Sequence, residues 1–417
     1  MSLFSKASLI ITPNAYKGGI SQGTLYSIVP NDGSNDFAVQ RASTATRVNS
    51  NGLLETVANN VIRIDYMNNY PTILTESSGT NLNKRSNEFS NVFYTKQGTT
   101  ATASSTDFTT SAKAFLLAET AVTGLHRCYS SDATIFKTSF LKYTTSCFFK
   151  KGSGAAAPDI VRLVTGSTLV NFANFNITTG TVLYVSTGVT ASITPYSNGW
   201  YRCSITAFPG AATTLEQIQF TNNTNSTAAP NSITYAGDVN RDVFIAGLQS
   251  ELGDIPTTYI PTIASTVTRI SDRLAMTALT AKSFFIDFNY NINAPIGGFL
   301  LTFVYNYFTY LAISDNKVYL DQYYNDDGNF ITISSIADTT NLLPRNKAAF
   351  KYYDTGGGIY RMKLFVNGVL IGEASDPIYA DSFYTNDIGA LNNTINSVLY
   401  FDEVLTDQEL INLTTIS

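Results

Sequence analysis

Tyrosines that run into amide and acidic residues are the side chains of this chain best suited to binding chemistry. The stretch "QYYNDDGN" places Tyr323 and Tyr324 ahead of Asn325 in a polar turn, where we expect at least one ring to face solvent. The stretch "KYYDTGGG" places Tyr352 and Tyr353 in the same way. An exposed aromatic ring beside planar hydrogen-bonding side chains can stack on a sugar and bind its hydroxyl groups. These five residues are the predicted sugar-binding candidates.

Three aspartates near the first tyrosine pair are the metal-ligating candidates. Asp321, Asp326 and Asp327 carry carboxylate oxygens, which bind Ca²⁺ when they lie on loops. An ordinary solvated turn explains the same residues. No paired cysteine or histidine spacing indicates zinc. The sequence therefore predicts no cofactor and leaves calcium open as the alternative.

Catalytic arrangements are poorly represented. His126 is the only histidine, and no G-x-S-x-G nucleophile elbow accompanies it. Glycoside hydrolysis needs two carboxylates about 5–10 Å apart, one of them with a raised pKa. The acidic residues Asp402, Glu403 and Asp407 instead surround the start of a short helix, where negative charge complements the helix dipole. The sequence predicts a protein that is not an enzyme, with a polysaccharide depolymerase as the enzymatic alternative.

Composition excludes several classes of partner. The 417 residues include 26 basic and 31 acidic side chains, and charged residues make up only 14% of the chain. No run of Lys and Arg exceeds two residues, so we expect no nucleic-acid partner. No apolar run approaches the ~18 residues of a membrane helix, so we expect no membrane insertion. We interpret Cys128, Cys147 and Cys203 as buried small hydrophobes of a protein made in a reducing cytoplasm.

Period-two patterns and turn residues dominate the chain, which predicts an all-β fold. Apolar residues alternate in "YTTSCFFKKG" and "GWYRCSITA", and Asn367-Gly368 marks a hairpin in "RMKLFVNGVLIGEA". The stretch "DVFIAGLQ" is largely apolar on both sides, which is typical of a central strand. One short helix is expected in "LTDQELINL", where Thr406 and Glu409 form a capping box.

Four consecutive segments follow from the spacing of these patterns. Residues 1–80 are too polar to form a core of their own and are expected to be a small β or extended attachment segment. Residues 81–262 and 274–417 each predict an antiparallel β-sandwich, because strands recur between Gly and Asn turns. Residues 263–273 are expected to link the two sandwiches.

Three groups of residues carry a resemblance to a known kind of protein. Residues 41–66 read "RASTATRVNSNGLLETVANNVIRIDY", and residues 246–262 read "AGLQSELGDIPTTYIPT". The third group is "LFVNGVLIG" with "NSVLYFDEVLTDQEL". These stretches resemble, in turn, the leader, the carbohydrate-binding-module-like jelly roll and the laminin-G or concanavalin-like sandwich of modular bacteriophage tail-fibre and appendage proteins. Where that family often has an acidic pair, this chain has Asn396-Ser397, so no calcium or acid role is implied there.

The resemblance implies a bacteriophage virion structural protein, a tail fibre or surface appendage that displays lectin-like sandwiches for host attachment. Residues 1–80 would attach it to other virion proteins, and the sandwiches would bind host-surface polysaccharide. A homo-oligomer, specifically a homotrimer, is also implied. The protein would be assembled in the bacterial host cytoplasm and lie on the virion surface. A purely structural capsid or tail decoration protein without sugar binding is the alternative.

Overall fold

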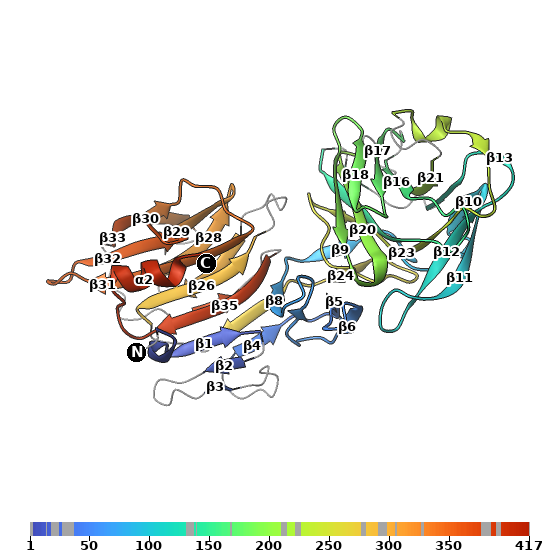
Figure 1. Ribbon diagram of the computed structural model, residues 1–417. Helices are drawn as coiled ribbons and strands as arrows, with labels where there is room; N and C mark the ends of the chain where they lie inside the picture. The colour runs from blue at the N-terminus through green and yellow to red at the C-terminus, as the bar shows by residue number, and fades with distance from the viewer. Residues whose placement is uncertain are drawn as a thin grey trace. The chain divides into compact units, whose positions relative to one another are not determined.

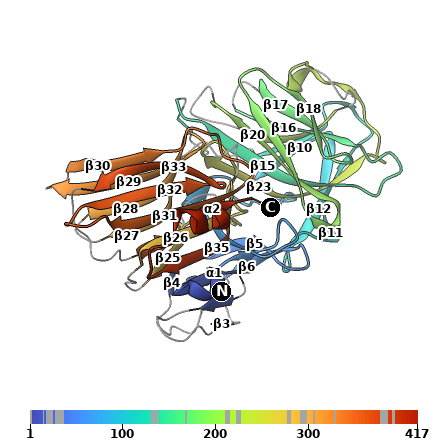
Figure 2. The same ribbon diagram turned by 60° about the vertical axis from the view of Figure 1, so that its left-hand side comes forward.

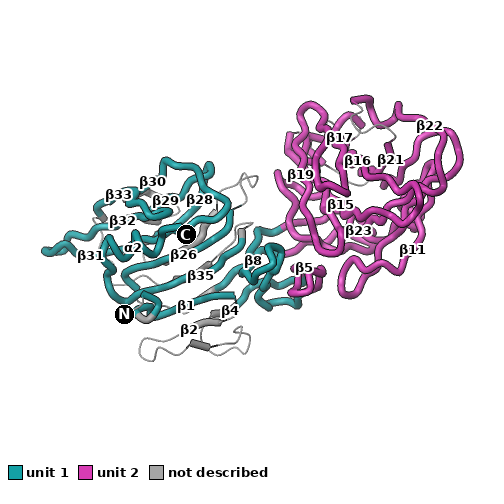
Figure 3. Tube along the Cα trace, in the orientation of Figure 1, with its two compact units in different colours: residues 1–44, 57–78, 270–417 teal, residues 45–56, 79–269 magenta. Residues whose placement is uncertain are grey.

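The chain folds into two compact β units, which Figure 3 shows in different colours. Unit 1 comprises residues 1–44, 57–78 and 270–417, and unit 2 comprises residues 45–56 and 79–269. In this computed structural model the described residues, to which every structural statement refers, are 3–13, 15–17, 25–26, 37–130, 137–138, 140–166, 169–209, 215–221, 227–276, 281–290, 298–304, 307–326, 329–376, 385–388 and 393–416.

Unit 1 contains two large antiparallel sheets, which confirms the all-β prediction for this part of the chain. The first sheet has, in spatial order, β3 (Leu25–Tyr26), β2 (Ala15–Lys17), β1 (Leu9–Thr12), β35 (Asn393–Phe401), β26 (Ser283–Asn289), β31 (Arg345–Asp354), β32 (Tyr360–Val366) and β33 (Val369–Asp376), with β8 (Thr72–Thr75) beside β35 and β7 (Ile64–Asp65) beside β8. The second sheet has β30 (Asn329–Ala337), β29 (Lys317–Asp326), β28 (Tyr307–Ser314), β27 (Gly298–Val304), β34 (Thr385–Ile388), β25 (Arg273–Met276) and β4 (Phe37–Gln40). Figures 1 and 2 show β28 to β30 as a layer distinct from β26, β31 and β32.

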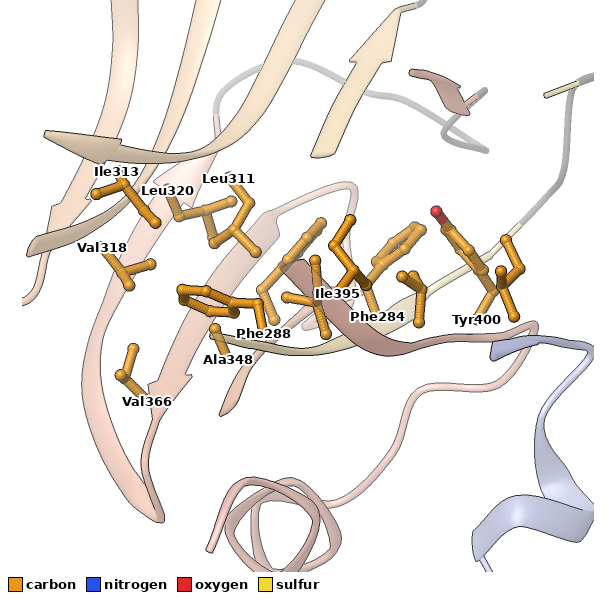
Figure 4. Close-up of a cluster of buried hydrophobic side chains, with 14 of the residues drawn as sticks. Phe284, Phe288, Leu311, Ile313, Val318, Leu320, Ala348, Val366, Ile395 and Tyr400 are labelled. Atoms are coloured by element: carbon orange, nitrogen blue, oxygen red, sulfur yellow. The ribbon is translucent and has the colours of Figure 1, made fainter. Parts of the chain in front are cut away.

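The two sheets of unit 1 share one apolar core (Figure 4). Phe284 and Phe288 enter it from β26, and Leu311 and Leu320 enter it from the facing sheet. Successive strand residues point to opposite faces, so this alternation puts every second side chain inside. The core therefore arises from the period-two pattern that the sequence shows.

The opposite face of the first sheet is covered by the two short helices α1 (Leu3–Lys6) and α2 (Asp407–Thr414). Leu410 of α2 packs in one cluster with Phe285 and Phe401 of the sheet. Thr406 and Glu409 form both hydrogen bonds of the expected capping box. No helix in the described ranges is long and apolar enough to cross a membrane.

Unit 2 is a second antiparallel sandwich. Its β14 sheet has, in spatial order, β10 (Tyr94–Gln97), β14 (Arg127–Ser130), β21 (Glu216–Phe220), β16 (Ile160–Thr165), β17 (Asn171–Asn176) and β18 (Thr181–Val185). Its β23 sheet has β11 (Thr99–Asp107), β12 (Lys113–Glu119), β23 (Asp242–Leu252), β15 (Tyr143–Lys151), β20 (Trp200–Ala207) and β19 (Thr190–Pro195). Smaller elements are the strand pairs β5 (Ala45–Val48) with β6 (Leu54–Val57), β9 (Gly79–Asn81) with β24 (Val267–Arg269) and β13 (Thr123–Gly124) with β22 (Tyr235–Ala236), and the 3₁₀ turns η1 (Ser197–Gly199) and η2 (Pro230–Ser232).

The strand that the sequence predicts as central, β23, does lie inside its sheet, between β12 and β15. The chain that follows it returns across the outer face of the same sheet. There the Tyr259 ring packs 5.4 Å from that of Phe108, and its hydroxyl lies 2.7 Å from Ser86 Oγ. Arg202 of β20 donates to the Thr257 carbonyl at 2.6 Å. The closing motif "PTTYIPT" therefore seals one outer face of unit 2.

The division into units differs from the four consecutive segments expected from the sequence. Residues 1–80 are not a separate segment, because β1 and β8 both pair with β35 near the C-terminus. Residues 45–56 belong to unit 2. The expected linker, residues 263–273, contains β24, which pairs with β9. Most of unit 2 is thus an insertion between residues 78 and 270 of unit 1.

A buried charge cluster in unit 1 joins the chain before the insertion to the chain after it. Asp272 accepts hydrogen bonds from Arg41 Nη1 at 2.8 Å, from Arg63 and from the Glu76 amide at 3.0 Å. Arg63 also pairs with Glu76 at 2.7 Å. Burial alone would lower the pKa of Arg63, but the two carboxylates hold it above its usual value. Both guanidinium groups are buried, so each needs these carboxylates.

We predict that Asp272→Ala lowers the free energy of unfolding of the full chain by about 3–5 kcal/mol, because it leaves buried arginine charge without its carboxylate. Urea unfolding followed by circular dichroism measures the change. The matched control is Asp159→Ala, which removes a half-exposed ion pair with Lys151 and should cost at most about 1 kcal/mol. Equal losses in the two variants would contradict the role given to Asp272.

Candidate functional site

The first predicted tyrosine pair lies in a strand rather than in a turn. β29 continues through Asp326, and its backbone pairs Tyr323 with Phe308 and Tyr324 with Tyr307. Asn325 therefore lies in the strand, where the sequence predicted a turn. The side chains of Tyr323, Tyr324 and Asn325 lie outside the described residues, so their role in sugar binding stays a prediction.

The second predicted pair is divided between the two faces of β31. Tyr352 is only 4% exposed and stacks on Tyr360 with ring centroids 5.3 Å apart. It belongs to the core and offers no ring to a ligand, so this candidate was wrong. Tyr353 points to the opposite face and is half-buried; its hydroxyl donates to Glu373 at 2.9 Å. The Lys351 ammonium lies 5.1 Å from the Tyr353 ring, so this ring already has a cationic partner.

Only one of the three metal candidates has a described side chain, so the calcium site stays a prediction. Asp321 Oδ1 accepts a hydrogen bond from Ser335 at 2.5 Å. The Asp326 side chain and all of Asp327 lie outside the described residues. Within the described ranges, no group of three or more His, Cys, Asp or Glu residues has an arrangement that could hold a metal ion.

The residues weighed for catalysis have structural partners. His126 is buried, with Nδ1 2.7 Å from the Gly98 carbonyl and Nε2 3.2 Å from the Tyr235 carbonyl. Burial opposes a low pKa at Asp407, but ion pairs with Lys351 and Lys363 outweigh it and lower that pKa. A glycosidase acid needs the opposite shift. Asp407 is therefore unsuited to that role.

A different candidate binding site lies on the outer face of the β14 sheet. Alternation along β14 and β21 turns Cys128 and Ile218 into the core of unit 2. It turns their neighbours outward, and strand pairing sets Arg127 beside Gln97 and Gln219, and Tyr129 beside Gln217. We call this set the Arg127 site, and it consists of Gln97, Arg127, Tyr129, Gln217 and Gln219.

The guanidinium of Arg127 organises the site through neutral partners. Its Nε donates to Gln97 Oε1 at 2.8 Å, and its Nη1 donates to Gln217 Oε1 at 3.1 Å. Its Cζ lies 4.8 Å from the centroid of the Tyr129 ring, a cation–π contact. The Arg127 plane is thus fixed by two amides and one aromatic ring.

Two amide atoms of the site lack hydrogen-bond partners. Gln217 is fully buried and Gln219 is 1% exposed. The Gln219 Nε2 donates to the Pro230 carbonyl at 2.6 Å, but its Oε1 and the Nε2 of Gln217 have no partner. A buried polar atom without a partner costs about 1–3 kcal/mol. One unused donor and one unused acceptor therefore lie at neighbouring positions of the site.

The polar row continues across the sheet away from Arg127. On β16 and β17, Arg162 donates to Asn174 Oδ1 at 2.7 Å and lies 4.3 Å from the Phe172 ring centroid. The Tyr184 ring of β18 follows, 5.6 Å from that of Phe172. Arg162 also donates to the Ala228 carbonyl at 3.3 Å, so the segment ahead of η2 covers the middle of this face. The same segment also contacts the Arg127 site, because Gln219 Nε2 donates to the Pro230 carbonyl of η2.

Burial lowers the pKa of both arginines on this face. For Arg127 the shift is downward, and for Arg162 it reaches about 10. In each case desolvation is the leading cause. Both groups stay protonated at neutral pH, and the face therefore carries partly desolvated positive charge.

The sequence contains a signal for this site that is separate from the exposed loop tyrosines. The stretches "RCYS" and "EQIQF" place Arg127 with Tyr129, and Gln217 with Gln219, two residues apart. Planar polar residues at period two mark one face of a strand. The pattern alone cannot show that both strands become neighbours, because long segments separate them along the chain.

Comparisons with known proteins give no family assignment. No family model matches the chain, and no curated protein matches it. Among solved structures, a leech intramolecular trans-sialidase complexed with 2,7-anhydro-Neu5Ac matches at 16% identity over 34% of this chain and 24% of that chain, with a TM-score of 0.26. Domains LG4-5 of the mouse laminin alpha1 chain match at 11% identity over 68% of this chain and 82% of that chain, with a TM-score of 0.16. TM-scores this low do not carry an argument about function.

We predict that the three cysteines are unreactive in the native protein. Burial raises the pKa of Cys128 to about 12 and also raises the pKa values of Cys147 and Cys203. All three thiols are free and buried, and the thiolate is the reactive form. When the native protein is titrated with a disulfide reagent at pH 8, none of the three cysteines should react until denaturant is added. Rapid reaction of the native protein would show that a thiol is accessible.

Proposed function

We propose that the protein is a non-enzymatic saccharide-binding protein and that the Arg127 site of unit 2 holds the sugar. The observation that carries the proposal is the pair of unpartnered amide atoms, Gln217 Nε2 and Gln219 Oε1, beside an oriented guanidinium. A sugar hydroxyl both donates and accepts, so hydroxyl groups of one saccharide can satisfy both atoms.

The side chains of the site also match the demands of a sugar in shape and rigidity. Amide and guanidinium groups are planar and offer hydrogen bonds in fixed directions. The Tyr129 ring supplies an apolar surface with a small conformational-entropy cost on binding. Strands hold these groups more firmly than loops do. Such a site binds a preformed saccharide surface without rearrangement of the sheet.

We further propose that the chain is a bacteriophage virion protein, a fibre or appendage displayed on the particle surface. This proposal rests on the resemblance of residues 41–66 and 246–262 to such proteins. Its partners would be other virion proteins, a host-surface polysaccharide and further copies of the chain in a homotrimer. Electron microscopy of intact particles labelled with an antibody against the protein tests the location.

The test of saccharide binding compares wild type with Tyr129→Ala, Tyr184→Ala and the double variant on a glycan array. We expect Tyr129→Ala to weaken binding at least tenfold, because the guanidinium loses its supporting ring. Loss that depends mainly on Tyr184→Ala would place the sugar at Tyr184 instead of at the Arg127 site. Tyr70→Ala, which removes a 44% exposed tyrosine of unit 1, is the matched control and should bind as wild type does.

The double variant Tyr323→Ala/Tyr324→Ala separates this proposal from the alternatives. Loss of binding only in that variant moves the site to unit 1. Absence of glycan binding by the wild-type protein refutes the saccharide proposal and favours a decoration protein. Release of reducing ends from host polysaccharide during long incubation would indicate a depolymerase.

A further inference from the structure

The electrostatic character of the Arg127 site specifies a class of saccharide. Several arginines of the chain form ion pairs with carboxylates that neutralise their charge, as Arg47 does with Glu55 at 2.6 Å. Arg127 differs, because its partners Gln97, Gln217 and Tyr129 are all neutral. No described Asp or Glu forms an ion pair with it.

The guanidinium also keeps unused donors. Nε and one hydrogen of Nη1 are engaged by the two amides. The Nη2 group and the second hydrogen of Nη1 have no partner among the described residues. Two hydrogens on adjacent nitrogens match the two oxygens of a carboxylate, which is the geometry of the strong bidentate pair.

The neighbouring amides reinforce this preference. Gln217 turns its Oε1 toward Arg127, so its unpartnered Nε2 is an additional donor within the same small area. Desolvation lowers the pKa of Arg127, which shows that the positive charge is partly removed from water. An anion at this position restores favourable interactions that the lost water no longer provides.

We propose that the saccharide recognised at the Arg127 site is acidic, with an anionic substituent bound by the guanidinium of Arg127 and a hydroxyl group bound by Gln217. The substituent is a carboxylate or a sulfate ester, both of which offer paired oxygens to a planar cation. The inference rests on the proposed saccharide binding and adds the charge of the ligand to it.

The experiment uses the full chain on an array that carries neutral, carboxylated and sulfated glycans. We expect the bound glycans to be acidic, and the preferred charged group tells carboxylate from sulfate. Chemical reduction of the carboxyl groups, or desulfation, of a bound glycan should weaken its binding at least tenfold. Raising NaCl from 0.05 to 0.5 M should lower the affinity for the acidic glycan and leave the affinity for any neutral glycan nearly unchanged.

The variant Arg127→Gln should lose the preference, so that the acidic glycan and its neutralised form bind equally. Arg127→Lys keeps the charge without the planar fork and should retain a reduced preference. Arg47→Gln removes an equal charge from the same unit, away from this sheet, and should behave as wild type. Thermal melts establish that each variant is folded.

The outcomes separate the two proposals. Equal binding of acidic and neutralised glycans by wild type, or a preference that survives Arg127→Gln, overturns the acidic inference and leaves saccharide binding intact. Failure of the wild-type protein to bind any glycan overturns both.

Discussion

The fold depends on a chain that leaves unit 1 and must return to it at the same place. Arg41 and Arg63 lie in the chain before residues 79–269, and Asp272 lies in the chain after them. Both arginines donate hydrogen bonds to Asp272. Their charges are buried, so each requires the opposite charge at hydrogen-bond distance. Pairing of β9 with β24 brings the two connections together just beyond this cluster. The arginines of the leader-like segment thus serve the closure of the fold itself.

Alternation along the strands places polar side chains on the outer faces of both sheets of unit 2. On the β23 sheet, the returning chain covers the face, and Gln249 and Arg202 bind the backbone of residues 257–260. On the β14 sheet the outward atoms Gln217 Nε2 and Gln219 Oε1 have no partner, and on the β23 sheet the same holds for Arg202 Nε. The same strand geometry therefore places partly satisfied polar side chains on both outer faces, and the proposed saccharide site uses those of the β14 sheet.

The sequence was sufficient for features that depend on local pattern. The hairpin at Asn367-Gly368 and the helix cap at Thr406 follow from turn and capping chemistry within a few residues, and both are present. The division into units was not predictable, because the pairing of β1 with β35 joins residues nearly the whole chain apart. Tyr352 was misjudged because a one-residue difference in strand phase decides between core and surface.

Sequence patterns also concealed the site, since its members come from β10, β14 and β21. Their proximity is a property of the sheet. Not every outward position of this face is polar, because Val164 pairs with Gln217 on it and is itself buried. An apolar residue in place of Gln217 or Gln219 would remove an unpaired buried atom, each of which costs about 1–3 kcal/mol, but it would also remove the hydrogen bond to Arg127 or to the Pro230 carbonyl. An acceptor oxygen of a ligand on Arg127 would give Gln217 Nε2 a partner, and a hydroxyl group of the same ligand could donate to Gln219 Oε1.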